Sequence, residues 1–203
     1  MVQLTKTTEL EAVNVMLSAI GEAPVSSLEN SQLEDVAVAQ NILNETIVDV
    51  QTTGYNFNSE YNYKISPDTD GIINVPNNAV FCDVSNRGST PDKDVVLRGE
   101  RLYDREEQTF TFTDSLYVDM ILILPWDDLP QPARRYITVK SARRFQNRVF
   151  GSDTLNGFTN TDENEALVQM EQADSRSEDA NILNRNWGVF KVLSRNGTRR
   201  YNL

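Results

Sequence analysis

The chain has 203 residues, of which 39% are hydrophobic and 24% charged, proportions typical of one globular domain of ordinary size or of one domain with an insertion. Its net charge of −11 at pH 7 argues against a general nucleic-acid binder, whose affinity depends on a widespread cationic surface. The absence of histidine excludes the common catalytic triads and His-ligated zinc sites, the single Cys82 excludes an internal disulfide, and the sequence predicts neither a signal peptide nor a membrane span.

Two helices are predicted at the start of the chain. Thr8 and Glu11 have the spacing of a capping box, and the apolar stripe that follows predicts a helix at about 9–20. A second capping box at Ser31 precedes apolar residues at helical spacing, which predicts a helix that ends near Gly54. Because the connection is short, we expect these two helices to pack antiparallel.

The pattern then changes to short β-prone runs separated by turn residues. The runs are YNYKI, GIINV, AVFCDV, DVVL, ERLYD, QTFTF and LYVDMILIL. Turn residues predict one hairpin at Arg98-Gly99 and a second at 113–115, which would join QTFTF to LYVDMILIL. The region therefore predicts an inserted, mostly antiparallel β domain in which Cys82 is a buried strand residue.

A basic segment follows at 132–150, which contains six cations and no acid within an acidic protein. We expect a third helix from Pro132 to Gly151, amphipathic and with a cationic outer face. The helix dipole disfavours positive charge in its first turn, which favours an external anionic partner there. The six cations are Arg134, Arg135, Lys140, Arg143, Arg144 and Arg148.

The end of the chain combines an acidic helix with a basic tail. Acidic residues and an apolar stripe predict the fourth helix at about 162–183, and the residues that we expect at an interface there are Glu163, Glu165 and Glu171. Residues 185–203 contain basic and aromatic side chains and no acid, a composition that favours a docking arm. Its candidate docking residues are Trp187, Phe190, Arg195, Arg199, Arg200 and Tyr201.

Three partners are possible for the basic segment. Its cations can pair with the acidic fourth helix of the same subunit, with an acidic face of a neighbouring protein, or with DNA. Arginine outnumbers lysine five to one, which indicates bidentate pairing with carboxylate or phosphate. The acidity of the chain favours carboxylate, and we expect protein contacts rather than DNA contacts.

Two pairs of acids are the candidates for enzymatic chemistry. Asp127 with Asp128, or Asp68 with Asp70, could serve glycoside hydrolysis or a metal. Asp127 and Asp128 directly precede a helix, where acids are expected as caps, and PDTDG is an ordinary turn sequence. We therefore predict no catalytic residue, no cofactor and no metal site.

Several motifs follow one another along the chain: EAVNVMLSAIGEAPVSSLE, AQNILN, GYNFN, ERLYDR and LPQPARRYITVKSARRFQNRVFGS, with DENEA after the last. In this order they resemble the tail tubular protein A family, the adaptor or gatekeeper proteins of short-tailed, T7-like bacteriophages. The resemblance covers nearly the whole chain and is weakest over 59–99 and past Asn181.

The resemblance implies a non-enzymatic virion protein that is made in the host cytoplasm and becomes part of the tail. It implies a homo-oligomeric ring of twelve subunits between the portal protein and the tail nozzle, tail tubular protein B, with possible contact to the tail fibre. DNA would pass through the lumen during ejection without specific binding, and an acidic lumen would suit that role. No membrane is involved.

We thus expect an α+β fold, an antiparallel helical bundle formed by both ends of the chain around an inserted β domain. The predicted parts are 1–58 (helical), 59–125 (β), 126–184 (helical) and 185–203 (basic docking tail). Two other functions stay open: a tail-associated polysaccharide hydrolase that uses Asp127 and Asp128, and a head-completion protein with direct DNA contacts.

Overall fold

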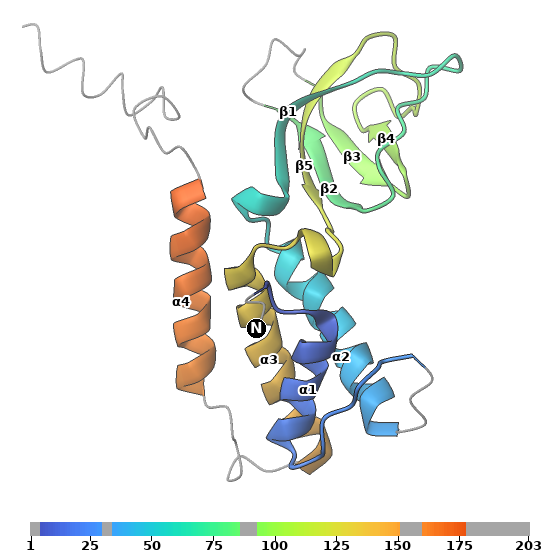
Figure 1. Cartoon of the computed structure of the whole chain (residues 1–203). Coiled ribbons are helices and arrows are strands. Elements are labelled where there is room, and N and C mark those ends of the chain that lie inside the picture. Colours follow the sequence, from blue (N-terminus) through green and yellow to red (C-terminus); the bar gives the residue numbers. More distant parts are fainter. Residues whose placement is uncertain (1–4, 30–33, 86–92, 151–159, 178–203) are drawn as a thin grey trace, which may run out of the picture.

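The computed structural model describes residues 5–29, 34–85, 93–150 and 160–177. Helices from the two ends of the chain form one end of an elongated molecule, and strands from its middle form the other end (Figure 1). The predicted α+β class, a helical bundle with an inserted antiparallel β region, is confirmed. Among the helices of these described ranges, none is long and apolar enough to cross a bilayer.

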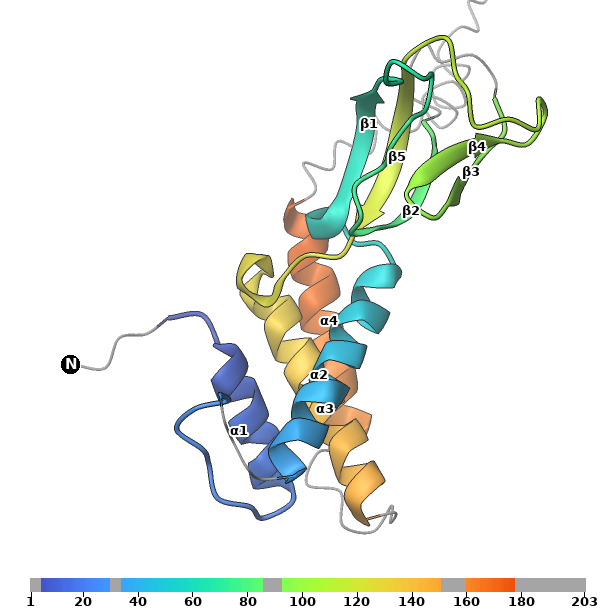
Figure 2. The ribbon, with the colours of Figure 1, turned by 90° about the vertical axis from the view of Figure 1, so that its right-hand side faces the viewer.

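Helices α1 (Glu9–Ala19), α2 (Glu34–Thr52), α3 (Gln131–Phe150) and α4 (Asn160–Ser177) alternate in direction along the chain (Figures 1 and 2). The predicted antiparallel packing of the first two helices is therefore confirmed. Helix α3 is central, because it contacts α1, α2 and α4.

The ends of the first two helices follow from their sequence. In the predicted capping box the Glu11 backbone N–H donates to Thr8 Oγ1 (3.2 Å), and the Thr8 N–H donates to Glu11 Oε2 (2.8 Å). Gly54 follows α2 with φ +79, a conformation that strains any residue with a side chain, and a Cβ there would also lie 2.6 Å from Ile121 Cδ1, which would have to move. The second predicted capping box lies outside the described residues at Ser31.

The helical core surrounds α3. Four consecutive residues, 136–139, are all buried, which requires neighbours on more than one side of the helix. The prediction of an amphipathic third helix with a cationic outer face therefore holds only in part: Arg135 and Arg148 are exposed and Lys140, Arg143 and Arg144 are partly exposed, whereas Arg134 is buried and burial extends around most of the helix. The largest fully buried side chains of this core are Met16, Leu17, Ile42, Leu43, Leu129, Ile137, Phe145 and Met170.

The β part consists of a sheet and a hairpin. Strands β1 (Ser59–Ile65) and β2 (Ala79–Val84) both pair antiparallel with β5 (Leu116–Leu122), which gives the order β1-β5-β2. Strands β3 (Val95–Arg98) and β4 (Arg101–Asp104) form the separate hairpin. A second core lies between the sheet and the hairpin, and Cys82 is buried in it as predicted.

Both predicted hairpins need correction. The first exists, but Arg98 is the last strand residue and pairs with Arg101, so the turn is Gly99-Glu100, with Gly99 at φ +66. The second does not form, because β5 pairs with β1 and β2 instead. The QTFTF run makes only isolated bridges, among them Ile72 with Thr111.

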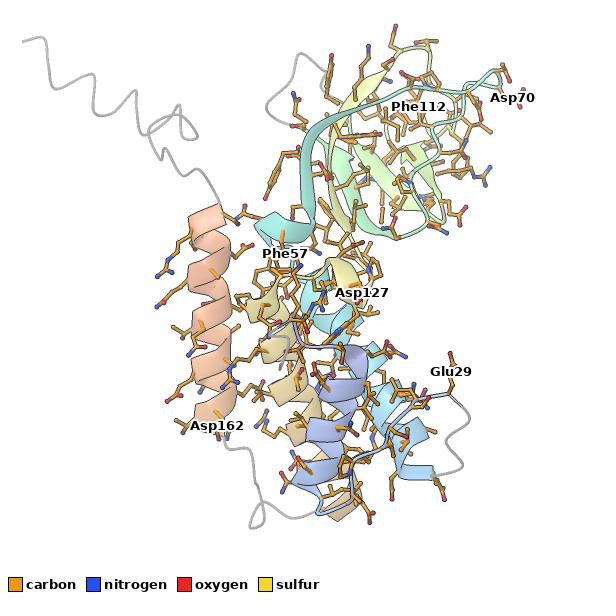
Figure 3. All side chains as sticks on the ribbon, in the orientation of Figure 1. Glu29, Phe57, Asp70, Phe112, Asp127 and Asp162 are labelled. Carbon is orange, nitrogen blue, oxygen red and sulfur yellow. The ribbon has the colours of Figure 1, made fainter. Side chains whose placement is uncertain are left out.

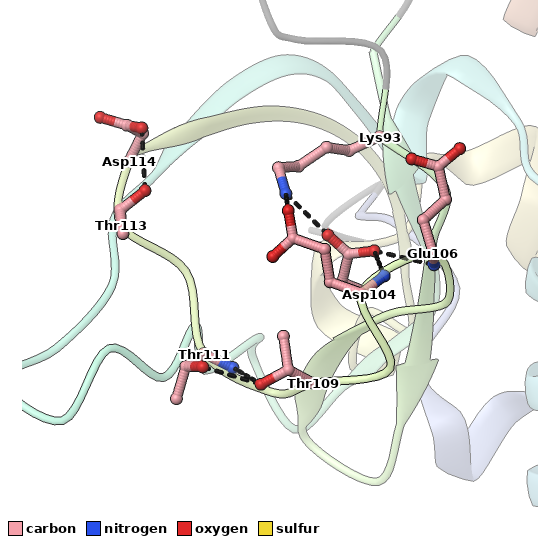
Figure 4. A network of polar contacts seen from close by, with 8 residues as sticks. Lys93, Asp104, Glu106, Thr109, Thr111, Thr113 and Asp114 are labelled. Atoms are coloured by element: carbon pink, nitrogen blue, oxygen red, sulfur yellow. Dashed lines mark hydrogen bonds and ion pairs between the residues drawn. The ribbon is translucent and has the colours of Figure 1, made fainter.

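A buried carboxylate holds the hairpin to the loop that follows it (Figure 4). Asp104 Oδ1 accepts the backbone N–H groups of Glu106 (2.9 Å) and Glu107 (3.0 Å), and its Oδ2 accepts Lys93 Nζ (2.7 Å). Lys93 also lies 3.0 Å from the Glu107 carboxylate. The pKa of Asp104 is lowered, chiefly by the hydrogen bond from Lys93.

Two amide side chains join the helical part to the sheet. Gln51 is fully buried at the end of α2, and its side chain both donates to Leu124 O (3.0 Å) and accepts from Leu124 N (2.8 Å). Asn58 Nδ2 donates to Gln51 O (2.9 Å) and Leu122 O (2.8 Å). These bonds link the end of α2 directly to the end of β5, so the junction between the two parts is specified rather than a free linker.

Candidate interface of the charged helices

Arg134 is the most buried of the six cations of the basic segment. Only 3% of its surface is exposed, its guanidinium donates to three backbone carbonyls, and it lies over the Trp126 ring at 5.8 Å. The acceptors are Leu129 O (3.0 Å), Thr7 O (2.8 Å) and Asp127 O (2.6 Å). Arg134 therefore fastens the N-terminal segment to the start of α3, and the prediction of an external anion is wrong for this residue.

Three other cations pair with carboxylates of the same chain. Arg144 Nη1 lies 2.7 Å from Asp49 Oδ2 and Arg148 Nη2 lies 3.4 Å from Glu45 Oε2, so both reach α2. These two pairs are solvent-exposed, and such pairs contribute about 0–1 kcal/mol each.

Arg143 makes the contact with α4. Its Nε lies 2.6 Å from Glu163 Oε2, although the angles do not satisfy a hydrogen bond, and its Nη1 donates to Asn160 Oδ1. The pair is more protected from water than the others, because the side chains of Arg143 and Glu163 are 29% and 14% exposed. It therefore contributes to holding the start of α4 against α3.

The remaining two cations have different surroundings. Lys140 donates to the hydroxyl of Tyr136 (3.1 Å), one helical turn earlier, and lies over the same ring at 5.2 Å. Arg135 is exposed beside the buried Arg134. The six cations thus do not form one surface, and the carboxylates that three of them reach lie on α2 as well as on α4.

The outer face of α4 remains acidic. Glu165 is exposed and lines a shallow groove along the helix together with Val168 and Gln172, and 49% of Val168 is exposed. Glu171 is also exposed, and its charge is one of the causes that raise the pKa of Tyr55, after burial of that ring and the charge of Tyr136. Of the three predicted acids, Glu163 points into the bundle, and Glu165 and Glu171 stay accessible.

The far end of α4 is fixed by a residue that the sequence analysis did not identify. The Asp174 carboxylate accepts the backbone N–H groups of Asn56 (2.9 Å) and Phe57 (3.2 Å) at the start of the short helix η1 (Asn56–Asn58). The contact joins segments more than a hundred residues apart, and the sequence carries no local signal for it. Phe57, Pro132 and Met170 line a small apolar cavity beside it.

The two candidate carboxylate pairs lie in different parts of the molecule. Asp127 lies where the helical part meets the sheet, whereas Asp70 lies at the opposite end of the β part (Figure 3). Asp68 accepts the N–H groups of Asp70 and Ile72 at 2.9 Å each, which confirms the turn interpretation and lowers its pKa, chiefly through the bond from Ile72. Within the described ranges no cluster of three or more acids or cysteines could hold a metal ion.

The predicted docking tail at 185–203 lies outside the described residues, and so do Trp187, Phe190, Arg195, Arg199, Arg200 and Tyr201. Apart from Arg134, the interface roles of the charged residues on α3 and α4 stay predictions.

Comparison with known proteins supports the resemblance drawn from the motifs. The sequence matches the family described as tail tubular protein over residues 10–180. It is 31% identical over 129 residues to the tail tubular protein A of Klebsiella phage KP34, a match that covers 64% of this chain and 66% of that protein, just under two thirds. The family match covers nearly all of the four described helices together with the three-stranded sheet and the β3–β4 hairpin. The chain therefore belongs to the tail tubular protein family, a family of structural proteins of bacteriophage tails.

Proposed function

We propose that the chain is the adaptor subunit of a phage tail, which assembles as a closed ring of twelve between the portal and the nozzle and forms part of the channel for DNA ejection. The observation that carries the proposal is the family match over residues 10–180, together with the similarity to a tail tubular protein A. The protein would be made in the host cytoplasm and assembled into the virion there.

The distribution of charge supports a cyclic assembly. A closed ring uses heterologous contacts, so each subunit needs two different, complementary faces. The outer face of α4, with Glu165 and Glu171, is one candidate face. Arg135 and Arg148 are exposed on α3 and are candidates for the complementary face. The helical part would make the ring and portal contacts, and the β part would project toward the nozzle and fibre.

The acidity of the chain supports a channel that does not retain DNA. With a net charge of −11, a ring of copies would repel phosphates at most surfaces, so the passing duplex would not bind. The cations of α3 do not contradict this, because Arg134, Arg143 and Arg144 already have acceptors within the chain.

The test is electron microscopy of the purified protein mixed with its portal. We expect rings stacked coaxially on the portal, and their symmetry gives the number of subunits. Monodisperse protein that leaves the portal bare would overturn the adaptor assignment. A duplex-binding assay at low salt separates the head-completion alternative, which requires retained DNA and a steep loss of affinity as salt increases.

A further inference from the structure

The outer face of the three-stranded sheet carries an exposed aromatic groove. The β3–β4 hairpin lies to one side of the three-stranded sheet (Figures 1 and 2). Leu116, Val118 and Met120 of β5 are buried in the core on that side, so the alternate residues Asp119 and Ile121 lie on the opposite face. Tyr61 of β1 and Phe81 of β2 line a groove over these residues, and they are 40% and 46% exposed.

The groove is also acidic. Asp83 of β2 and Asp119 of β5 are directly opposite each other in the sheet register, an arrangement that is destabilising for like charges unless cations lie nearby. Arg105 is near enough to Asp83 that its own pKa is raised, chiefly by Asp94 and also by Asp83, so this pair is partly compensated within the described residues. Burial chiefly raises the pKa of Cys82, the residue of β2 that precedes Asp83, to about 12, and the charges of Asp83 and Asp119 raise it further. A ligand of this surface therefore needs positive charge together with apolar or aromatic side chains.

The C-terminal segment of the chain has this composition. Residues 185–203 contain Arg185, Lys191, Arg195, Arg199 and Arg200 and no acid, and their aromatic residues are Trp187, Phe190 and Tyr201. The attachment point of the segment also lies near the groove. Helix α4 is described to Ser177, one turn after Asp174, which bonds to η1 directly before β1, and Ser59 at the start of β1 lines the groove. Residues 178–184 can span at most about 24 Å.

We propose that residues 185–203 bind the outer face of the sheet of their own chain. Their aromatic side chains pack against Tyr61, Phe81 and Ile121, and their cations neutralise the opposed Asp83 and Asp119. Each aromatic side chain that enters the groove removes apolar surface from water on both sides, and each cation relieves the like-charge pair. The inference concerns a contact within one chain and does not depend on ring assembly.

Paramagnetic labelling of the full chain tests the contact. Cys82 is buried and its pKa is about 12, so a nitroxide attaches selectively to a new cysteine in the variant Ser194→Cys. In ¹⁵N-labelled protein we expect the amide signals of Tyr61, Phe81 and Asp119 to lose more than about half of their intensity relative to the reduced label. Signals of α1, at the other end of the molecule, should keep theirs.

A paired substitution tests the chemistry. Asp83→Asn with Asp119→Asn removes both charges but keeps the Oδ1 acceptors for the Val84 and Asn62 N–H groups. We expect the ratio of bound to free tail to fall about fivefold, as for the loss of two modest ion pairs. The matched control Glu22→Gln with Glu29→Gln removes two exposed charges from the helical part and should leave the ratio unchanged.

A mixed sample separates the tail of the same chain from that of another copy. Spin-labelled protein without ¹⁵N is mixed with ¹⁵N-labelled protein without the nitroxide, and we expect no broadening of the groove signals. Broadening in that mixture would show a tail of a neighbouring copy in the groove and overturn the proposal. The proposal is also overturned if the groove signals are not broadened in the protein that carries both ¹⁵N and the nitroxide on the same chain. It is overturned as well if the Asp83→Asn, Asp119→Asn variant broadens them as strongly as the unaltered protein does.

Discussion

At the residue scale, Arg134 differs from the basic residues around it. The sequence places it in a run of six cations, and nothing in that run distinguishes it from Arg135. The distinction is made by long-range packing, which brings the carbonyl of Thr7 and the ring of Trp126 to the start of α3. Charge patterning alone predicted that Arg134 lies at the surface. Its acceptors are backbone carbonyls, and because every residue has one, no sequence motif marks them.

The substitution Arg134→Ala should destabilise the protein by about 3 kcal/mol, because it leaves three carbonyls without their charged donor. The measurement is the free energy of unfolding from urea titration. The matched control is Arg135→Ala, which removes an exposed neighbour of the same type and should change that free energy by less than about 0.5 kcal/mol. Equal effects of the two substitutions would show that the Arg134 contacts contribute little.

The ion pair of Asp104 and Lys93 makes the stability of the β part depend on pH at both the acid and the alkaline end. The pKa of Asp104 lies below its ordinary 3.8, so its contribution to stability is complete above that pH and is lost as the pH falls through the lowered value. The pKa of Lys93 lies above its ordinary 10.5, chiefly through the hydrogen bond to Asp104, so its contribution is complete below that pH and is lost as the pH rises through the raised value.

Asp104→Asn should therefore lower the free energy of unfolding at pH 7 and reduce its further decrease between pH 5 and pH 2, because one of the titrating groups is gone. Urea titrations across this range measure the effect. Glu100→Gln at the exposed hairpin turn serves as the control and should keep the acid dependence of the unaltered protein. An Asp104→Asn profile parallel to that of the control would contradict the linkage.

At the scale of elements, local signals predicted the helices better than the strands. The capping box at Thr8 and the breaks near Gly54 are local, and the limits of the first helix, the end of the second and the starts of the third and fourth were predicted to within about two residues. The end of the fourth helix, predicted at about 183, lies outside the described residues. Strand pairing depends on distant partners. The 108–112 run has strand composition, yet β5 pairs with β1 and β2, so the expected second hairpin does not form.

The junction between helices and sheet rests on Gln51, which sequence patterning treats as an ordinary polar helix residue. Gln51→Leu preserves its size but removes both hydrogen bonds to Leu124, and we expect a loss of about 2 kcal/mol in the free energy of unfolding. Hydrogen exchange at the Leu124 amide should accelerate more than exchange at the helical core. The exposed Gln172→Leu is the control and should leave both measurements unchanged.

At the scale of the whole molecule, the sequence motifs identified the family, whereas the roles of the individual charges required the structure. The basic segment is prominent in the sequence, but most of its cations are used inside the subunit: Arg134 binds backbone carbonyls, and Arg143 and Arg144 bind carboxylates. A charge reversal at Arg143 or Arg144 would therefore disturb the bundle itself. The charges that are accessible without such disturbance include Glu165 and Glu171 on the outer face of α4 and Arg135 on α3.

Glu165→Lys with Val168→Ser changes that face without touching a core residue, because both side chains are exposed and point away from α3. If α4 contacts the neighbouring subunit, the variant should keep the urea midpoint of the unaltered protein but form rings on the portal at least about tenfold less efficiently, since a like-charge contact replaces an attractive one and an apolar contact is lost. Ring formation is counted by electron microscopy at matched protein concentration.

Glu22→Lys with Val48→Ser applies the same chemical changes to exposed residues near α1 and on α2, and should leave assembly unaffected. Full assembly of the α4 variant would move the subunit contact to another face, whereas equal loss in both variants would indicate that net charge, rather than a specific surface, governs ring formation.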